Sequence, residues 1–236
     1  MDEKNVRDHA VNPPASRWDF ALNPVRIILK GMNGVEVEFG KDGIRLKRAE
    51  SSLDAFVKKF TQVLERRGID YVVVSGYVAI VFGRSRASED VDFILAPFNE
   101  DKFNDLWTAL EKAGFECINP CDREEGFSGY ISEGTALRFA LKGEFIPNAE
   151  IKFAANQLHE MALREKTPLY VNDWRIPISP IELQVAYKLF LGSEKDLEDA
   201  RFLYSLFKER LDRKKVVSLS QALKAEKNVK YLEATK

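Results

Sequence analysis

Residues 71–95 read YVVVSGYVAIVFGRSRASEDVDFIL, which predicts a strand, a turn, a short helix, a loop and a second strand. The first strand is apolar and ends at the small pair Ser75-Gly76. The second strand begins at a run of acidic residues that includes Asp90 and Asp92. Because side chains alternate along a strand, these two aspartates face one side of the sheet and the residues between and after them face the other.

Two carboxylates on one small patch repel each other, and one of them tends to hold its proton. A bound divalent cation removes this conflict, because it takes both carboxylates as oxygen ligands. The Ser75-Gly76 turn suits phosphate, since small residues let backbone N–H groups approach it closely. The stretch therefore predicts a metal site opposite a phosphate-binding turn. The plainer alternative is that Asp90 and Asp92 are solvated positions on a half-exposed strand.

The chain before this stretch predicts an arm and a β meander. Residues 1–23 are polar and show no clear period, which is typical of a poorly ordered arm. Residues 25–47 alternate apolar and polar residues around Asn33-Gly34 and Asp42-Gly43. These dipeptides are strong hairpin signals, so we expect three antiparallel strands.

Helical spacing of apolar residues marks further segments on both sides of the central stretch. A serine cap at Ser51 or Ser52 begins a helix that ends near Gly68, and residues 99–113 form another with a core-facing side. Residues 179–210 predict two helices broken near Gly192-Ser193. After them, the segment from position 208 to 236 has nine Lys or Arg against four Asp or Glu, so it is the clearly basic part of the chain.

Three further strands are expected between residues 127 and 154, with the sequences GYIS, ALRFALKG and NAEIKFA. In the last of them, Glu150 and Lys152 share one face. If this strand lies beside the one that carries Asp90 and Asp92, Glu150 completes a trio of carboxylates. Alternating charges are also common on solvated strands, so this residue has a plain structural alternative.

Composition and charge set the broader limits. The chain has 236 residues, 45% of them hydrophobic and 31% charged, which is typical of a globular protein. A net charge of −1 argues against coating nucleic acid through bulk charge, so a contact with a polyanion has to be local.

Location and cysteine use are predicted from the same sequence. The opening MDEKNVRDHA has no signal-peptide pattern, and no apolar run approaches the roughly 20 residues that span a bilayer. We therefore expect a cytoplasmic protein without a membrane partner. The two cysteines, Cys117 and Cys121, are expected to be structural or incidental, because a zinc site needs more ligands than they supply.

The string from Val74 to Phe93 resembles the signature of the nucleotidyltransferase superfamily, which has the polymerase-beta-like fold. That signature is an apolar residue, a Gly-Gly or Gly-Ser turn, about ten intervening residues, and Asp-x-Asp between apolar residues. In this chain Ser75 replaces the first glycine of the Gly-Gly form, and it is still small and able to hydrogen-bond phosphate.

A narrower resemblance is to the abortive-infection type of nucleotidyltransferase, the toxin of toxin–antitoxin pairs. It rests on Arg84, on Ser88-Glu89-Asp90-Val91-Asp92, and on a later Lys188 followed by Lys195-Asp196-Leu197-Glu198-Asp199. The likeness covers roughly residues 51–207. It implies an α+β fold with a mixed sheet and flanking helices, to which the residue patterns add an N-terminal β meander and a C-terminal helical part. The expected divisions are residues 1–50, 51–177 and 178–236.

The resemblance also implies a chemistry. A nucleoside triphosphate (NTP) and three facing carboxylates are tolerable together only with two Mg²⁺ ions between them, so Asp90, Asp92 and Glu150 are the expected catalytic residues and metal ligands. The expected nucleotide-binding residues are Ser75, Gly76, Arg84, Lys188, Lys195 and Asp199.

Several of these roles have open alternatives. Lys188 and Lys195 could belong to a solvated helix face, and Asp196 and Asp199 could pair with Lys195 or Arg201 within the helix. The choice between Arg84 and the nearby Arg86 stays open, although the family pattern favours the former.

The acceptor of the nucleotide is open as well. Expected acceptors are a hydroxyl of RNA such as tRNA, of a protein, or of a small molecule as in aminoglycoside nucleotidyltransferases. The basic C-terminal segment could hold an RNA backbone, and a cognate antitoxin is a further expected partner. The alternative function is a non-catalytic nucleotide-binding or interaction protein with a degenerate fold.

Overall fold

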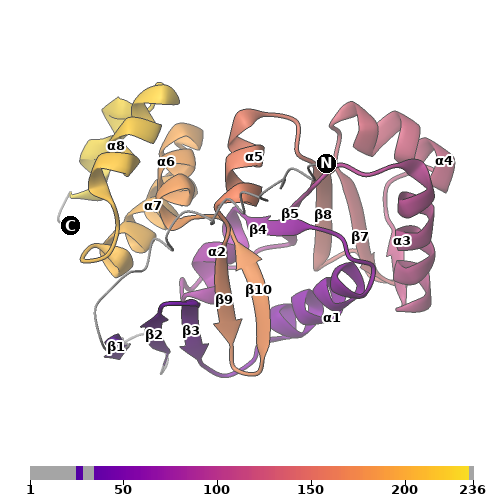
Figure 1. Cartoon of the computed structure of the whole chain (residues 1–236), viewed down its shortest axis with the longest axis horizontal. Coiled ribbons are helices and arrows are strands. Elements are labelled where there is room, and N and C mark those ends of the chain that lie inside the picture. Colours follow the sequence, from indigo (N-terminus) through magenta and orange to yellow (C-terminus); the bar gives the residue numbers. More distant parts are fainter. Residues whose placement is uncertain (1–24, 29–34, 234–236) are drawn as a thin grey trace, which may run out of the picture.

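The computed structural model describes residues 25–28 and 35–233, and within them ten strands form one mixed sheet flanked by helices (Figure 1). The strands are β1 (Val25–Ile28), β2 (Glu36–Gly40), β3 (Gly43–Lys47), β4 (Tyr71–Val74), β5 (Asp90–Leu95), β6 (Phe115–Cys117), β7 (Leu137–Leu141), β8 (Asn148–Phe153), β9 (Thr167–Val171) and β10 (Trp174–Ile178). The helices are α1 (Ser52–Arg66), α2 (Gly76–Val81), α3 (Glu100–Lys112), α4 (Arg123–Glu125), α5 (Gln157–Arg164), α6 (Ile181–Leu191), α7 (Glu194–Phe207) and α8 (Arg213–Ala222). The predicted α+β fold is confirmed.

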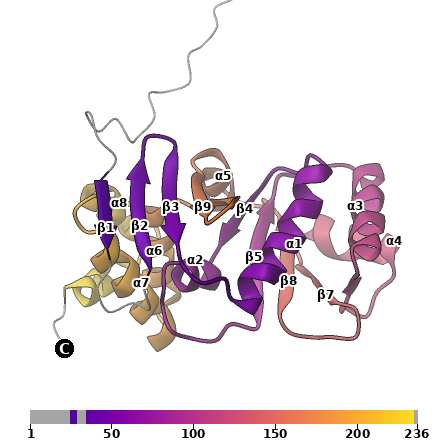
Figure 2. The ribbon, with the colours of Figure 1, turned by 90° about the horizontal axis from the view of Figure 1, so that it is seen from below.

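The sheet has the strand order β1-β2-β3-β9-β10-β4-β5-β8-β7-β6. The meander predicted for residues 25–47 is confirmed, because β1, β2 and β3 pair antiparallel in sequence (Figure 2). Its third strand then pairs in parallel with β9, so the meander extends the central sheet. The predicted arm at residues 1–23 and the turn at Asn33-Gly34 lie outside the described residues.

The centre of the sheet carries the predicted strand–helix–strand unit. β4 pairs antiparallel with β5, and β5 pairs in parallel with β8. α1 begins at Ser51, whose side chain accepts from the backbone N–H of Asp54 while the Asp54 carboxylate accepts from the backbone N–H of Ser51. Such a capping box contributes about 1 kcal/mol. The buried Asp54 also accepts a hydrogen bond from the Tyr77 hydroxyl at 2.7 Å, which fixes α2 against α1.

Helices cover the two faces of the central strands differently. On one face, Phe93 of β5 packs against Phe60 of α1 with ring centroids 5.1 Å apart, and α3 completes this main core. On the other face lies a small second core beneath α5 and α6. It consists of Val72, Ile94, Ala162 and Leu183. Because Asp90 and Asp92 alternate in phase with Ile94, both aspartates belong to the face covered by α5 and α6.

Two sequence-based predictions for the middle of the chain need correction. Residues 129–132 (GYIS), predicted as a strand, lie in helical turns at Gly126–Tyr130 and Ile131–Glu133. The alternating pattern is only four residues long, and a segment this short does not separate a strand from a helical turn. The structure also adds β6, α5, β9 and β10, which the sequence did not predict.

The C-terminal helices lie together at one end of the molecule, at the left of Figure 1. The predicted pair of helices at 179–210 is confirmed as α6 and α7, which separate at Gly192 with a left-handed φ of 69°. Helix α8 follows and contacts α6. In the described part of the chain, no helix combines the length and apolar character that crossing a membrane requires. The divisions near residues 50 and 177 stay predictions.

Candidate active site

The two aspartates and the Ser75-Gly76 turn meet at one end of the central strands. β4 and β5 are in register with Val74 opposite Asp92, so the turn that follows Val74 lies directly beside the aspartates. Ser75 has φ 61° and ψ −133°, a conformation that costs a non-glycine residue energy and that clusters at functional sites. The Ser88 hydroxyl lies 3.0 Å from the backbone oxygen of Asp90 and 3.3 Å from its carboxylate, which orders the entry to β5.

Glu150 lies next to Asp92, as the sequence analysis anticipated. The parallel pairing of β5 and β8 puts the two residues opposite each other, on the face covered by α5 and α6. The Glu150 carboxylate accepts hydrogen bonds from Nε and Nη2 of Arg138 at 3.0 and 2.8 Å, and the Lys152 ammonium is 3.8 Å away. In this structure the third carboxylate therefore has cationic partners from β7 and β8. Both hydrogen bonds from Arg138 go to Oε2, so the proposed role of Glu150 as a metal ligand would use Oε1.

The electrostatics of Asp92 show how closely these carboxylates are placed. Burial, and then the charges of Asp90 and Glu150, raise the pKa of Asp92 from 3.8 to about 6, against the opposing effects of Lys152 and Ser75. Burial is the main cause of this shift, and the neighbouring carboxylates add to it, as expected of acids that share a site. An added cation would relieve the repulsion between them.

We expect the ionisation of Asp92 to lower the stability of the metal-free protein as the pH rises from about 4 to about 6. The pKa of Asp92 is about 6 in the folded protein and 3.8 in an ordinary setting, so across this window the folded state keeps a proton that the unfolded chain has released. One pKa unit corresponds to about 1.4 kcal/mol, so the loss is about 2–3 kcal/mol. Urea unfolding of wild type and Asp92→Asn in EDTA, from about pH 4 to about pH 7, measures it.

The variant cannot ionise at this position, so its free energy of unfolding should rise relative to wild type through that window and stay constant above it. Comparing the two proteins cancels the titration of all other groups. A difference that does not change with pH would show that Asp92 titrates normally, and that its surroundings are described wrongly.

Behind the turn lies a buried network of charges. The Arg86 guanidinium makes two hydrogen bonds to Asp199, at 3.1 and 2.9 Å, and lies so close to Gly76 that a Cβ there would collide with it. The Lys188 ammonium, 1% exposed, lies 2.7 Å from Asp196 and 3.1 Å from Asp199. Since Arg86 is tethered, glycine is the residue that fits position 76. The network fastens the Ser75-Gly76 turn to α6 and α7.

The other predicted nucleotide-binding residues lie around this network. Arg84 pairs with Glu198, and its Nε is 3.6 Å from Asp199. Lys195 is exposed on the first turn of α7. Asp196 and Asp199 take these partners from other elements, rather than only from within α7. Burial would raise the pKa of Asp196, but hydrogen bonds from Lys188 and Ser193 lower it below its ordinary value.

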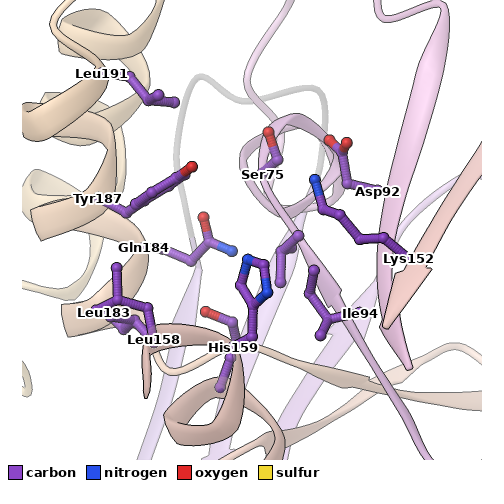
Figure 3. A pocket seen from close by; sticks show the side chains of 13 residues that line it. Ser75, Asp92, Ile94, Lys152, Leu158, His159, Leu183, Gln184, Tyr187 and Leu191 are labelled. Carbon is purple, nitrogen blue, oxygen red and sulfur yellow. The ribbon is translucent and has the colours of Figure 1, made fainter. Parts of the chain in front are cut away.

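A pocket of about 150 Å³ opens beside Asp92 and Ser75 and runs down between α5 and α6 (Figure 3). Its floor is apolar and comes largely from the second core. Polar side chains enter it from β8, α5 and α6, namely Lys152, His159, Gln184 and Tyr187. The sequence pattern placed Lys152 on the same face as Glu150, but no pattern pointed to His159, Gln184 or Tyr187 as site residues. The one signal available was that Gln184 precedes Lys188 by one helical turn, which gives both the same helix face.

The donor set fits a magnesium ion at Asp90 and Asp92. Within the residues that the structure describes, no three His, Cys, Asp or Glu side chains are gathered as a preformed metal site. Mg²⁺ characteristically binds one or two carboxylates together with substrate phosphates, rather than an all-protein cage. The adjacent aspartates, with one raised pKa, supply the protein's share of such a site.

Comparisons with known proteins concern the fold. No protein-family model matches the chain, and no curated protein matches it either. Among solved structures, it is similar to an antigenic nucleotidyltransferase-like protein from Paracoccidioides brasiliensis, with 19% identity, a TM-score of 0.47, and coverage of 76% of this chain and 92% of that one.

Two antibiotic-modifying enzymes are also similar. ANT(2″)-Ia, in complex with adenylyl-2″-tobramycin, shares 10% identity with a TM-score of 0.46, covering 75% of this chain and 99% of that one. The lincosamide antibiotic adenylyltransferase LnuA, bound to lincomycin, shares 13% identity with a TM-score of 0.44, covering 66% of this chain and 98% of that one. The structural neighbours are thus nucleotidyltransferases. The function proposed below rests on the residues of the site itself.

Proposed function

We propose that this protein is a Mg²⁺-dependent nucleotidyltransferase, which moves a nucleoside monophosphate from an NTP to a hydroxyl acceptor and releases pyrophosphate. The observation that carries the proposal is the meeting of Asp90 and Asp92 on one strand with the Ser75-Gly76 turn on the next. Paired carboxylates beside a phosphate-binding turn are the requirement for activating an α-phosphate.

Each part of the site has a chemical task. Asp90 and Asp92 would hold the metal, with Oε1 of Glu150 as a further ligand. Bound Mg²⁺ would lower the pKa of the attacking hydroxyl and stabilise the departing pyrophosphate. Glu150 accepts the proton of that hydroxyl, whose oxygen attacks the α-phosphorus while the bond to the β-phosphate oxygen breaks.

The remaining residues bind and orient the triphosphate. Backbone N–H groups at Ser75 and Gly76 approach the phosphates, and Arg84 and Lys195 add positive charge at the rim. Lys188 was predicted to be a nucleotide-binding residue. Because Asp196 and Asp199 already neutralise its ammonium, we propose that Lys188 and Asp199 act through Arg86, by holding the turn in place.

An RNA acceptor, such as tRNA, is the acceptor we propose, and the basic C-terminal segment is where its backbone would bind. Two of the basic side chains there already have carboxylate partners, Arg213 with Glu233 and Lys215 with Glu165. Lys214, Lys224, Lys227 and Lys230 are exposed around them. A toxin role held in check by a cognate antitoxin is the biological setting that we propose for this activity.

The test is transfer of label from α-³²P-labelled NTPs, each supplied with Mg²⁺, to separate pools of total RNA, protein and aminoglycoside. Wild type should label the RNA pool, and the double variant Asp90→Ala/Asp92→Ala should not. Labelling of only the protein or antibiotic pool would overturn the RNA acceptor while leaving nucleotidyl transfer intact. NTP binding without transfer to any pool would instead identify a non-catalytic nucleotide-binding protein.

A further inference from the structure

The pocket between α5 and α6 is continuous with the proposed site but is chemically unlike it. Its mouth lies at Ser75 and Asp92, where the phosphates would bind, and its floor is made of aliphatic side chains such as Ile94 and Leu183. A highly charged triphosphate has no partner on such a floor. A neutral, largely apolar group does, because ligand pockets combine apolar walls with a few placed polar groups.

Gln184 is the polar group that needs a partner. Its side chain points into the pocket from α6, between Tyr187 and His159 (Figure 3), and the residue is 3% exposed. Among the residues that the structure describes, none forms a hydrogen bond with the buried Oε1. A buried acceptor without a donor is destabilising, and native proteins keep such groups rarely. An occupant that donates a hydrogen bond would satisfy it.

The neighbours of Gln184 narrow the kind of occupant. Tyr187 offers an aromatic side chain along one wall, suited to a flat ring. Burial and the nearby Lys152 lower the pKa of His159, so its imidazole stays neutral near pH 7 and adds no charge to the floor. A primary amide pairs with an edge that offers a donor next to an acceptor, as every nucleobase does. The pocket therefore suits a flat, neutral heterocycle.

We propose that this pocket holds the base of the incoming nucleotide, with Gln184 reading its hydrogen-bonding edge and Tyr187 packing against its ring. The inference rests on the proposed nucleotidyl transfer, because it takes the occupant to be part of the NTP. Gln184 is then a specificity-determining residue. A hydrogen bond from the base would satisfy the Gln184 Oε1 atom.

The test measures binding without turnover, on the full-length protein in buffer with Mg²⁺, since none of the probes is a nucleoside triphosphate that could be turned over. The probes are adenosine, guanosine, cytidine and uridine, titrated by saturation-transfer NMR, together with inorganic tripolyphosphate followed by calorimetry. Wild type should bind one nucleoside best. Gln184→Leu should lower the affinity for that nucleoside by about tenfold, as expected when a hydrogen bond in a buried site is lost. The affinity for tripolyphosphate should stay unchanged.

Two comparisons make the result specific. Gln62→Leu, at an exposed position of α1 on the other side of the sheet, should leave all five affinities unchanged. Gln184→Leu should unfold at the same temperature as wild type or above it, because leucine removes a buried unpaired acceptor. Equal weakening of nucleoside and tripolyphosphate, or no nucleoside binding to wild type, would overturn the assignment.

Failure of the proposed function gives a different result. If the protein binds nucleosides through Gln184 but labels no acceptor, the base pocket is supported and the proposed nucleotidyl transfer is contradicted. If wild type transfers label and Gln184→Leu shows the same NTP preference as wild type, nucleotidyl transfer is supported and the base pocket is contradicted.

Discussion

Asp92→Asn should lower the rate of nucleotidyl transfer by about a thousandfold or more while leaving the fold intact. Asparagine has nearly the same shape but cannot hold a divalent cation as a carboxylate does. Metal-assisted stabilisation of a phosphoryl transition state is worth several kcal/mol, and each 1.4 kcal/mol or so corresponds to a factor of ten in rate. Initial rates of label transfer from α-labelled NTP measure the loss.

The matched control is Asp105→Asn on α3. Asp105 is 53% exposed, pairs with Arg67 on the surface, and lies on the helix that covers the opposite face of the sheet. Its replacement should leave the rate unchanged. Above about pH 6, Asp92→Asn should lower the transfer rate but raise the free energy of unfolding. A misfolded variant would show a lower value of both. Near-normal transfer by Asp92→Asn would remove this residue from the catalytic site.

Lys188→Met should destabilise the protein by about 3–5 kcal/mol, because it leaves two buried carboxylates without their shared cation. Asp196 and Asp199 are 8% and 0% exposed, so water cannot replace the ammonium. For a chain of this size, the loss corresponds to a melting temperature roughly 10 °C lower or more. Differential scanning calorimetry measures it.

Lys195→Met is the control, since that lysine is exposed on the same helical hairpin, and it should change the melting temperature little. Adding Asp196→Asn to Lys188→Met should recover part of the loss, because it removes the carboxylate whose ion pair was with Lys188, whereas Asp199 keeps Arg86. A Lys188→Met protein that melts like wild type would show that the buried network does not hold α6, α7 and the phosphate-binding turn together.

The local parts of the fold could be predicted from the sequence. Ser51 begins α1 and Asp42-Gly43 turns β2 into β3, because caps and tight turns depend on a few adjacent residues. The strand carrying Asp90 and Asp92 was equally visible. The segment at 129–132 was not, since four residues are too few for a period to separate a strand from helical turns.

The site residues likewise divide into those that local sequence predicts and those that depend on tertiary contacts. The alternation rule gave the shared face of Asp90 and Asp92, and the structure puts Glu150 beside them. The partners of these acids come from elsewhere in the chain. Arg138 meets Glu150 only through the pairing of β7 with β8, and Arg86 meets Asp199 only when α7 packs behind the turn. Such contacts arise from tertiary structure, which no motif encodes.

The most direct test of nucleotidyl transfer follows the two ends of the triphosphate in one reaction. The protein is incubated with Mg²⁺, total tRNA and the preferred NTP, labelled in parallel samples on the α- or the γ-phosphate. The proposal predicts that α-label enters the RNA while an equal amount of γ-label appears as pyrophosphate, and that Asp90→Ala/Asp92→Ala abolishes both. Transfer of γ-label to the acceptor, or release of inorganic phosphate with no α-label transferred, would contradict it.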